Sequence, residues 1–138
     1  MTQPLHIALL GAMPEEIGSD LSHLKELSCS EHGDLKIHRG SWSEKVRLSL
    51  AWSGWGKVSA ARAATRLLAS DPSIDLLLFT GVAGAADPAL RQWDVVLADA
   101  VVQHDMDARP LFPRFTLPAL NQDRLQPQPA WFNWAKAA

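Results

Sequence analysis

The sequence lacks the features that are typical of disulfide-bonded, nucleic-acid-binding and membrane proteins. Cys29 is the only cysteine, so an intrachain disulfide is excluded. The 13 basic side chains are balanced by 15 acidic ones and form no basic stripe, which argues against a nucleic-acid partner. No apolar run reaches the ~20 residues of a membrane helix, and no cationic leader precedes an apolar stretch. We therefore expect a soluble, cytoplasmic protein with neither a membrane nor a nucleic-acid partner.

The sequence does contain enough apolar residues for one hydrophobic core. Hydrophobic residues make up 47% of the 138 residues, an ordinary share for a globular protein. This predicts a single α/β domain over residues 1–138.

Local patterns in the first half predict strands that alternate with helices. The apolar run 5–10, closed by Gly11, predicts a strand of a parallel sheet. Pro14 suits a first helical turn, and the apolar residues after it recur every three or four positions, which predicts a helix covering the sheet. These apolar residues are Ile17, Leu21, Leu24 and Leu27. Alternating apolar and polar residues predict two antiparallel strands near 35–40 and 45–52.

The second half begins with a helix and a strand and then loses its periodicity. Residues 53–70 pass from a glycine-rich loop into alanine-rich helical composition, and residues 73–81 predict another buried strand. Residues 94–102 predict a further strand, whereas residues 104–131 hold five prolines and predict a long loop. Residues 130–138 have the composition of a helix start. The predicted fold is therefore α/β, with a mixed central sheet flanked by helices.

Tryptophan is abundant, with six residues in the chain. Most of these large side chains are expected in the core. Trp131 and Trp134 are expected at the surface.

Three glycine-containing loops are predicted to follow strands: GAMPEE at 11–16, SGWGKVSA at 53–60 and TGVAGAAD at 80–87. The carboxyl ends of parallel strands share one edge of a sheet, where ligands bind in α/β proteins. The three loops therefore predict a ligand site at that edge. The helix dipole alone also explains acidic residues in a first helical turn, such as Glu15 and Glu16.

Two weaker motifs point to other kinds of site. Gly54 and Gly56 are similar to a dinucleotide-binding fingerprint, but Asp75 stands at the start of its strand and not at the end, where the ribose-binding acid is needed. His104 to Asp107, the sequence HDMD, offers metal-ligand side chains without a distant cluster to join them. We expect no metal site there, and hydrogen bonds that anchor the loop.

In order and spacing, these motifs resemble the methylthioadenosine/S-adenosylhomocysteine nucleosidases of the purine nucleoside phosphorylase superfamily. IALLGAMPEE looks like that family's first strand and catalytic loop, and SGWGKVSAA looks like its next glycine loop. TGVAGA resembles its nucleoside-binding loop, and DVVLADAVVQHDMD resembles its next strand and dimer-contact segment. The resemblance covers residues 5–125.

The resemblance implies hydrolysis of an N-glycosidic bond, with release of adenine and no cofactor. Glu16 would be the catalytic carboxylate that activates the attacking water. The residues that would bind the nucleoside are Met13, Trp55, Val82, Ala83 and Gly84. Val82 stands where the family often has a hydroxyl residue, which argues against a phosphate-dependent reaction.

The resemblance also implies a homodimer in which the loop after the HDMD motif reaches into the partner's pocket. The residues implied for this dimer and pocket loop are His104, Asp105, Asp107, Leu111, Phe112 and Phe115. The family's adenine-binding segment and its leaving-group acid would lie beyond Ala138. On this basis we expect the N-terminal portion of a nucleosidase, truncated at its C-terminus, with little activity on its own.

Three alternatives stay open at this point. One is another activity of the same superfamily, either futalosine hydrolysis or phosphorolysis. A second is a non-catalytic fragment that binds a ligand or associates through residues 104–115 and its exposed tryptophans. The third is a nicotinamide-dependent protein built on Gly54 and Gly56.

Overall fold

The computed structural model describes residues 3–18 and 21–137. The chain divides into two compact units, residues 1–84 and residues 85–138, and each is described by itself. That both units belong to one α/β domain stays a prediction.

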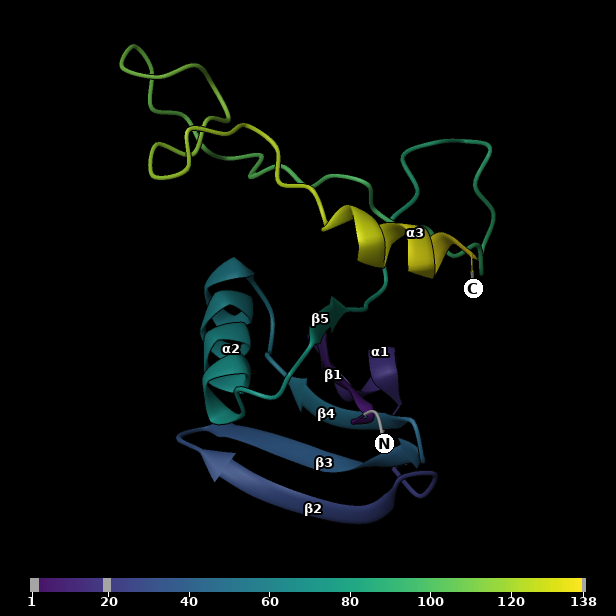
Figure 1. The fold of residues 1–138 in the computed structure, drawn as a ribbon. Coiled ribbons are helices and arrows are strands. Elements are labelled where there is room, and N and C mark those ends of the chain that lie inside the picture. The colour runs from purple at the N-terminus through teal and green to yellow at the C-terminus, as the bar shows by residue number, and fades with distance from the viewer. Residues whose placement is uncertain (1–2, 19–20, 138) are drawn as a thin grey trace. The chain divides into compact units, whose positions relative to one another are not determined.

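The first unit is built on a mixed five-stranded sheet in the order β2-β3-β4-β1-β5 (Figure 1). The strands are β1 (Leu5–Gly11), β2 (Lys25–His32), β3 (Leu35–Ser43), β4 (Val46–Trp52) and β5 (Leu76–Phe79). Strand β1 pairs in parallel with both β4 and β5, whereas β2, β3 and β4 are joined by antiparallel pairing. The mixed sheet and the parallel central strand that the sequence predicts are confirmed.

The core lies between the sheet and helix α2 (Lys57–Ser70), which packs against β1, β3 and β4. Small residues allow close approach, since Ala8 of β1, Ala51 of β4 and Ala63 of α2 are fully buried. Leu67 lies one turn after Ala63 on the same face of α2 and is also fully buried. The helix predicted within residues 53–70 is confirmed.

The long helix expected after Pro14 is wrong. Helix α1 (Pro14–Ile17) makes a single turn, and Gly18 follows it with φ of 92°, a conformation that favours glycine and ends the helix. The chain then forms β2, an extra strand at the edge of the sheet, where Leu27 is exposed. Leu27 belongs to β2, which pairs with β3. Its helical spacing from Ile17 therefore does not reflect a helix.

The second unit contains helix α3 (Pro129–Ala137) and two isolated β-bridges, Val101 to Leu125 and Leu117 to Gln122. The helix start and the long proline-rich loop are confirmed. The strand expected over residues 94–102 is wrong, because only Val101 there pairs with another described residue, and Val95 is 97% exposed. A strand needs a continuous partner for its backbone N–H and C=O groups, and hydrophobicity alone does not supply one.

The expectation that most tryptophans lie in the core is also wrong. Trp52 and Trp131 are half-buried, and the other four are exposed. Among the described residues, the buried cluster between α2 and the sheet consists of alanine, leucine and isoleucine side chains. Across residues 3–18 and 21–137, no helix is long and apolar enough to span a membrane.

Candidate active site at the carboxyl edge of the sheet

The three glycine-containing loops begin side by side, as the sequence predicts. They follow β1, β4 and β5, which are parallel neighbours with their carboxyl ends at one edge of the sheet. Three backbone hydrogen bonds join these ends: Ser53 N–H to Gly11 O at 2.9 Å, Gly54 N–H to Ala12 O at 3.0 Å and Thr80 N–H to Leu10 O at 3.0 Å. The sheet itself therefore brings the loops together.

Glu16 connects two of these loops through its carboxylate. Its Oε2 accepts the backbone N–H of Ala12 at 2.5 Å and that of Met13 at 3.0 Å. Its Oε1 accepts the N–H of Val82, in the loop after β5, at 3.4 Å. One side chain thus spans the carboxyl ends of β1 and β5.

The local sequence explains part of this arrangement. Pro14 starts the one-turn helix, which places Glu16 at the third helical position, where glutamate commonly turns back to the N–H of the residue before the helix. This capping accounts for the bonds to Ala12 and Met13. It does not account for the bond to Val82, which is 66 residues further along the chain. Glu15, on the same turn, is exposed and makes none of these bonds.

The hydrogen bonds fix the charge state of Glu16. The N–H groups of Met13, Ala12 and Val82, in that order of importance, lower the pKa of the carboxyl, with burial opposing them. The group is therefore an anion at neutral pH. Its Oε2 takes two donors and Oε1 takes one long bond, so Oε1 has more capacity to accept a bond from water.

The structure brings together some of the predicted nucleoside-binding residues. Met13 and Val82 meet at the Glu16 carboxylate through their backbone N–H groups, and the Val82 side chain is 80% exposed. Ala83 and Gly84 continue from Val82 and are exposed. Trp55 is 77% exposed and follows Gly54, whose N–H bonds to the loop that carries Glu16. Nucleoside binding by these residues stays a prediction.

The predicted dimer and pocket loop lies in the second unit. Arg109 donates to both carboxylate oxygens of Asp107, from Nε at 2.9 Å and Nη2 at 2.6 Å, and lowers the pKa of Asp107 to about 2. These bonds lie within the loop itself, so the anchoring of the HDMD segment by hydrogen bonds stays a prediction. The remaining residues differ in exposure: His104, Asp105 and Leu111 are exposed, and Phe112 and Phe115 are half-buried. No group of three His, Cys, Asp or Glu residues that could hold a metal ion occurs in the part of the chain that the structure describes.

His6 is a polar residue buried in β1 that none of the sequence motifs includes. Its side chain is 2% exposed, with Nε2 at 2.8 Å from Ser49 Oγ and Nδ1 at 3.0 Å from Ser73 Oγ. Burial, above the smaller effects of nearby charges, lowers the pKa of the imidazole. His6 lies near the amino end of β1, far along the strand from Gly11 and the loop that carries Glu16. A histidine inside an otherwise apolar run was the signal available in the sequence.

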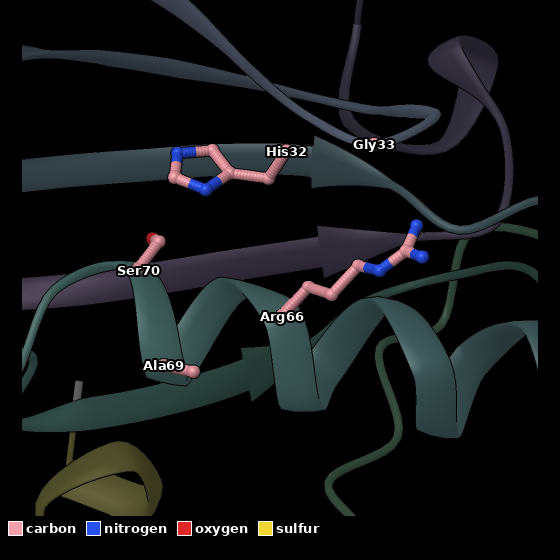
Figure 2. Close-up of a pocket in the computed structure, with 5 residues that line it drawn as sticks. All are labelled: His32, Gly33, Arg66, Ala69 and Ser70. Atoms are coloured by element: carbon pink, nitrogen blue, oxygen red, sulfur yellow. The ribbon is translucent and has the colours of Figure 1, made fainter.

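A hollow of about 440 Å³ lies between the β2–β3 turn and α2, lined by His32, Gly33, Arg66, Ala69 and Ser70 (Figure 2). The Arg66 side chain extends from α2 toward the turn, where its guanidinium and that of Arg62 pair with Asp34. Ser70 Oγ is also engaged, since it accepts a bond from Arg39 at 2.6 Å. These contacts hold the turn to the helix, and we assign the hollow a structural role.

Comparison with known proteins matches residues 6–138 to the family model described as the phosphorylase superfamily. An aminodeoxyfutalosine nucleosidase from Campylobacter jejuni is 37% identical over 103 residues, covering 75% of this chain and 44% of the relative. A 5'-methylthioadenosine/S-adenosylhomocysteine nucleosidase from Chromohalobacter salexigens is 39% identical over 103 residues, covering 74% of this chain and 43% of the relative. The chain thus spans a little under half the length of these curated relatives.

The fold matches solved nucleosidase structures. The methylthioadenosine/S-adenosylhomocysteine nucleosidase of Colwellia psychrerythraea, in complex with adenine, has a TM-score of 0.87 and 29% identity, covering 98% of this chain and 55% of that one. The S-adenosylhomocysteine nucleosidase of Streptococcus pyogenes has a TM-score of 0.88 and 26% identity, covering 99% of this chain and 57% of that one.

Proposed function

The chain belongs to the phosphorylase superfamily, and on that premise we propose that it forms the water-activating part of a nucleosidase. The proposed reaction is hydrolysis of the N-glycosidic bond of methylthioadenosine or S-adenosylhomocysteine, with release of adenine. The observation that carries the proposal is the Glu16 carboxylate, held as an anion between the loops after β1 and β5. Relatives named as nucleosidases and a similar structure that contains adenine support the same reading.

The geometry accounts for one half of the reaction. As the bond between the sugar's anomeric carbon and the base nitrogen breaks, the sugar acquires oxocarbenium character and a water molecule attacks it. Oxygen Oε1 of Glu16 orients this water and receives its proton. The departing adenine needs a proton from another group, because Glu16 serves the water. Backbone N–H groups that hold Oε2 keep the carboxylate oriented throughout.

Substitution of Glu16 tests this role. The assay fuses residues 1–138 to the C-terminal part of the Chromohalobacter salexigens relative that this chain does not cover, and measures adenine release. We expect Glu16→Gln to lower the rate by ~10²- to 10⁴-fold, the usual contribution of a general base. Glu15→Gln is the matched control, since Glu15 lies on the same turn but is exposed, and its rate should not change. Equal rates of adenine release in the two variants would contradict the proposed role of Glu16.

A second substrate class is favoured by the 37% identity to the aminodeoxyfutalosine nucleosidase of Campylobacter jejuni. The same water-activating carboxylate serves either substrate, because both reactions break a bond between a sugar and a base. Parallel assays with methylthioadenosine and aminodeoxyfutalosine distinguish the two. Base release that requires inorganic phosphate would indicate a phosphorylase instead.

We also infer a cytoplasmic homodimer that acts in methionine salvage. Methylthioadenosine carries the methylthio group that such salvage recovers. The dimer contact would lie on the loop at residues 104–115, where Leu111 is 84% exposed. Sedimentation velocity at micromolar concentration should give a dimer for the chain and a monomer for Leu111→Asp. A wild-type chain that sediments as a monomer would refute this contact.

A further inference from the structure

The Glu16 carboxylate lies against two glycines that follow the parallel strands. A Cβ atom added at Gly81 would lie 3.0 Å from Oε1 and 3.3 Å from the carboxyl carbon. A Cβ atom added at Gly11 would lie 3.3 Å from Oε2 and 3.0 Å from the Ile17 side chain. The carboxylate therefore occupies space that a side chain at either position would take.

Backbone conformation does not explain the glycine at position 81. Four other glycines of the first unit, Gly18, Gly33, Gly54 and Gly56, have positive φ angles, but Gly81 does not. The φ angle of Gly81 therefore does not call for glycine, and the reason for glycine that the structure shows is the space that Glu16 fills. The same reasoning does not apply to Gly84, where an added Cβ would meet no atom within 4 Å.

We infer that Gly81 is a positioning residue for Glu16, whose missing side chain lets the carboxylate reach from the loop after β1 to the loop after β5. The inference rests on the proposed function, because it assigns the placement of the proposed water-activating group. The atom that a new methyl group would meet is the end of a flexible side chain, so the carboxylate moves before the backbone does. The bond to Val82, already 3.4 Å long, would then be lost, while the bonds at Oε2 remain.

A pair of alanine variants of the 138-residue chain tests this. Carbon-13 NMR follows the Glu16 side-chain carboxyl through a pH titration, and Glu16→Gln assigns the signal. In Gly81→Ala we expect the pKa of Glu16 to rise toward its ordinary value, because one donor is lost. The matched control, Gly84→Ala in the same loop, should leave this pKa as in the wild type. If Gly81→Ala leaves the pKa of Glu16 unchanged, or if the two variants change it equally, the inference is wrong.

A double variant keeps the test decisive should Gly81→Ala fold poorly. In the chain that keeps Glu16, Gly81→Ala should lower the midpoint of unfolding, because the new methyl group meets the carboxylate. In a Glu16→Ala background there is no carboxylate to meet, so the same substitution should leave the midpoint unchanged. This coupling is the signature of a direct contact between the two positions. A Gly81→Ala substitution that destabilises the chain equally in both backgrounds would show that the methyl meets something else, and would overturn the inference.

The kinetic arm separates this inference from the proposed function. In the fused enzyme, we expect Gly81→Ala to lower kcat by less than ~10²-fold with little change in KM, since misplacing a reacting group by about 1 Å costs that much and the new methyl group requires a smaller shift. A changed Glu16 pKa in Gly81→Ala, together with full activity of Glu16→Gln, would leave the positioning role intact and reject the catalytic one. An unchanged kcat in Gly81→Ala, with Glu16→Gln inactive, would reject the positioning role alone.

Discussion

His6 makes the stability of the first unit depend on pH near neutrality. Both of its ring nitrogens lie within hydrogen-bond distance of serine hydroxyls, and burial lowers the pKa of the imidazole below 6.5. In the unfolded chain the ring takes up a proton near pH 6.5, whereas in the fold it stays neutral to lower pH. The stabilisation is therefore complete above about pH 6.5 and is lost as the pH falls below that value.

Urea unfolding at pH 7.5 and 5.5 measures this effect. We expect the free energy of unfolding to decrease between these values in the wild type, and to decrease less in His6→Gln, which does not titrate. His23→Gln is the control because His23 is exposed. The carboxyls of Asp71 and Glu16, whose pKa values lie below the ordinary range, contribute only at lower pH. Equal pH dependence in the wild type and His6→Gln would rule His6 out as the cause.

Among the elements, those with a buried face could be predicted from local sequence. Strand β1 and helix α2 carry apolar residues at strand and helix spacing, and both formed as expected. Strand β2 could not be predicted, because its sequence KELSCSEH is almost entirely polar and its existence depends on pairing with β3. Residues 94–102 show the opposite case: the apolar pattern is present, but among the described residues only the single bridge from Val101 to Leu125 pairs with it.

The candidate site shows the same division between local and distant information. The position of Glu16 at the start of a helix after a strand can be predicted from the GAMPEE segment, and its capping hydrogen bonds are local. Its bond to Val82 depends on β1 and β5 lying side by side, which no local pattern specifies. For the same reason, the space between Gly81 and Glu16 became visible only in three dimensions.

At the scale of the whole molecule, the buried core belongs to the first unit. Its cluster draws on β1, β3, β4 and α2, with further apolar side chains from Ile74 and Leu77 packed against it. In the described part of the second unit, Thr116 is the only residue classed as buried, and Trp93 is 90% exposed. The two units should therefore differ in their resistance to local unfolding, which depends on buried apolar contacts.

Limited proteolysis with an arginine-specific protease measures that difference. All four arginines of the first unit lie in regular elements: Arg39 in β3, Arg47 in β4, and Arg62 and Arg66 in α2. These elements must unfold before a protease can bind the backbone. The arginines of the second unit lie in irregular backbone at Arg91, Arg109, Arg114 and Arg124. The first cuts should fall after Arg91, Arg114 and Arg124, because Pro110 protects the bond after Arg109, and should leave the sheet with α2 as the resistant fragment. Early cleavage after Arg39 or Arg62 would mean that the sheet and α2 are not the stable part of the chain.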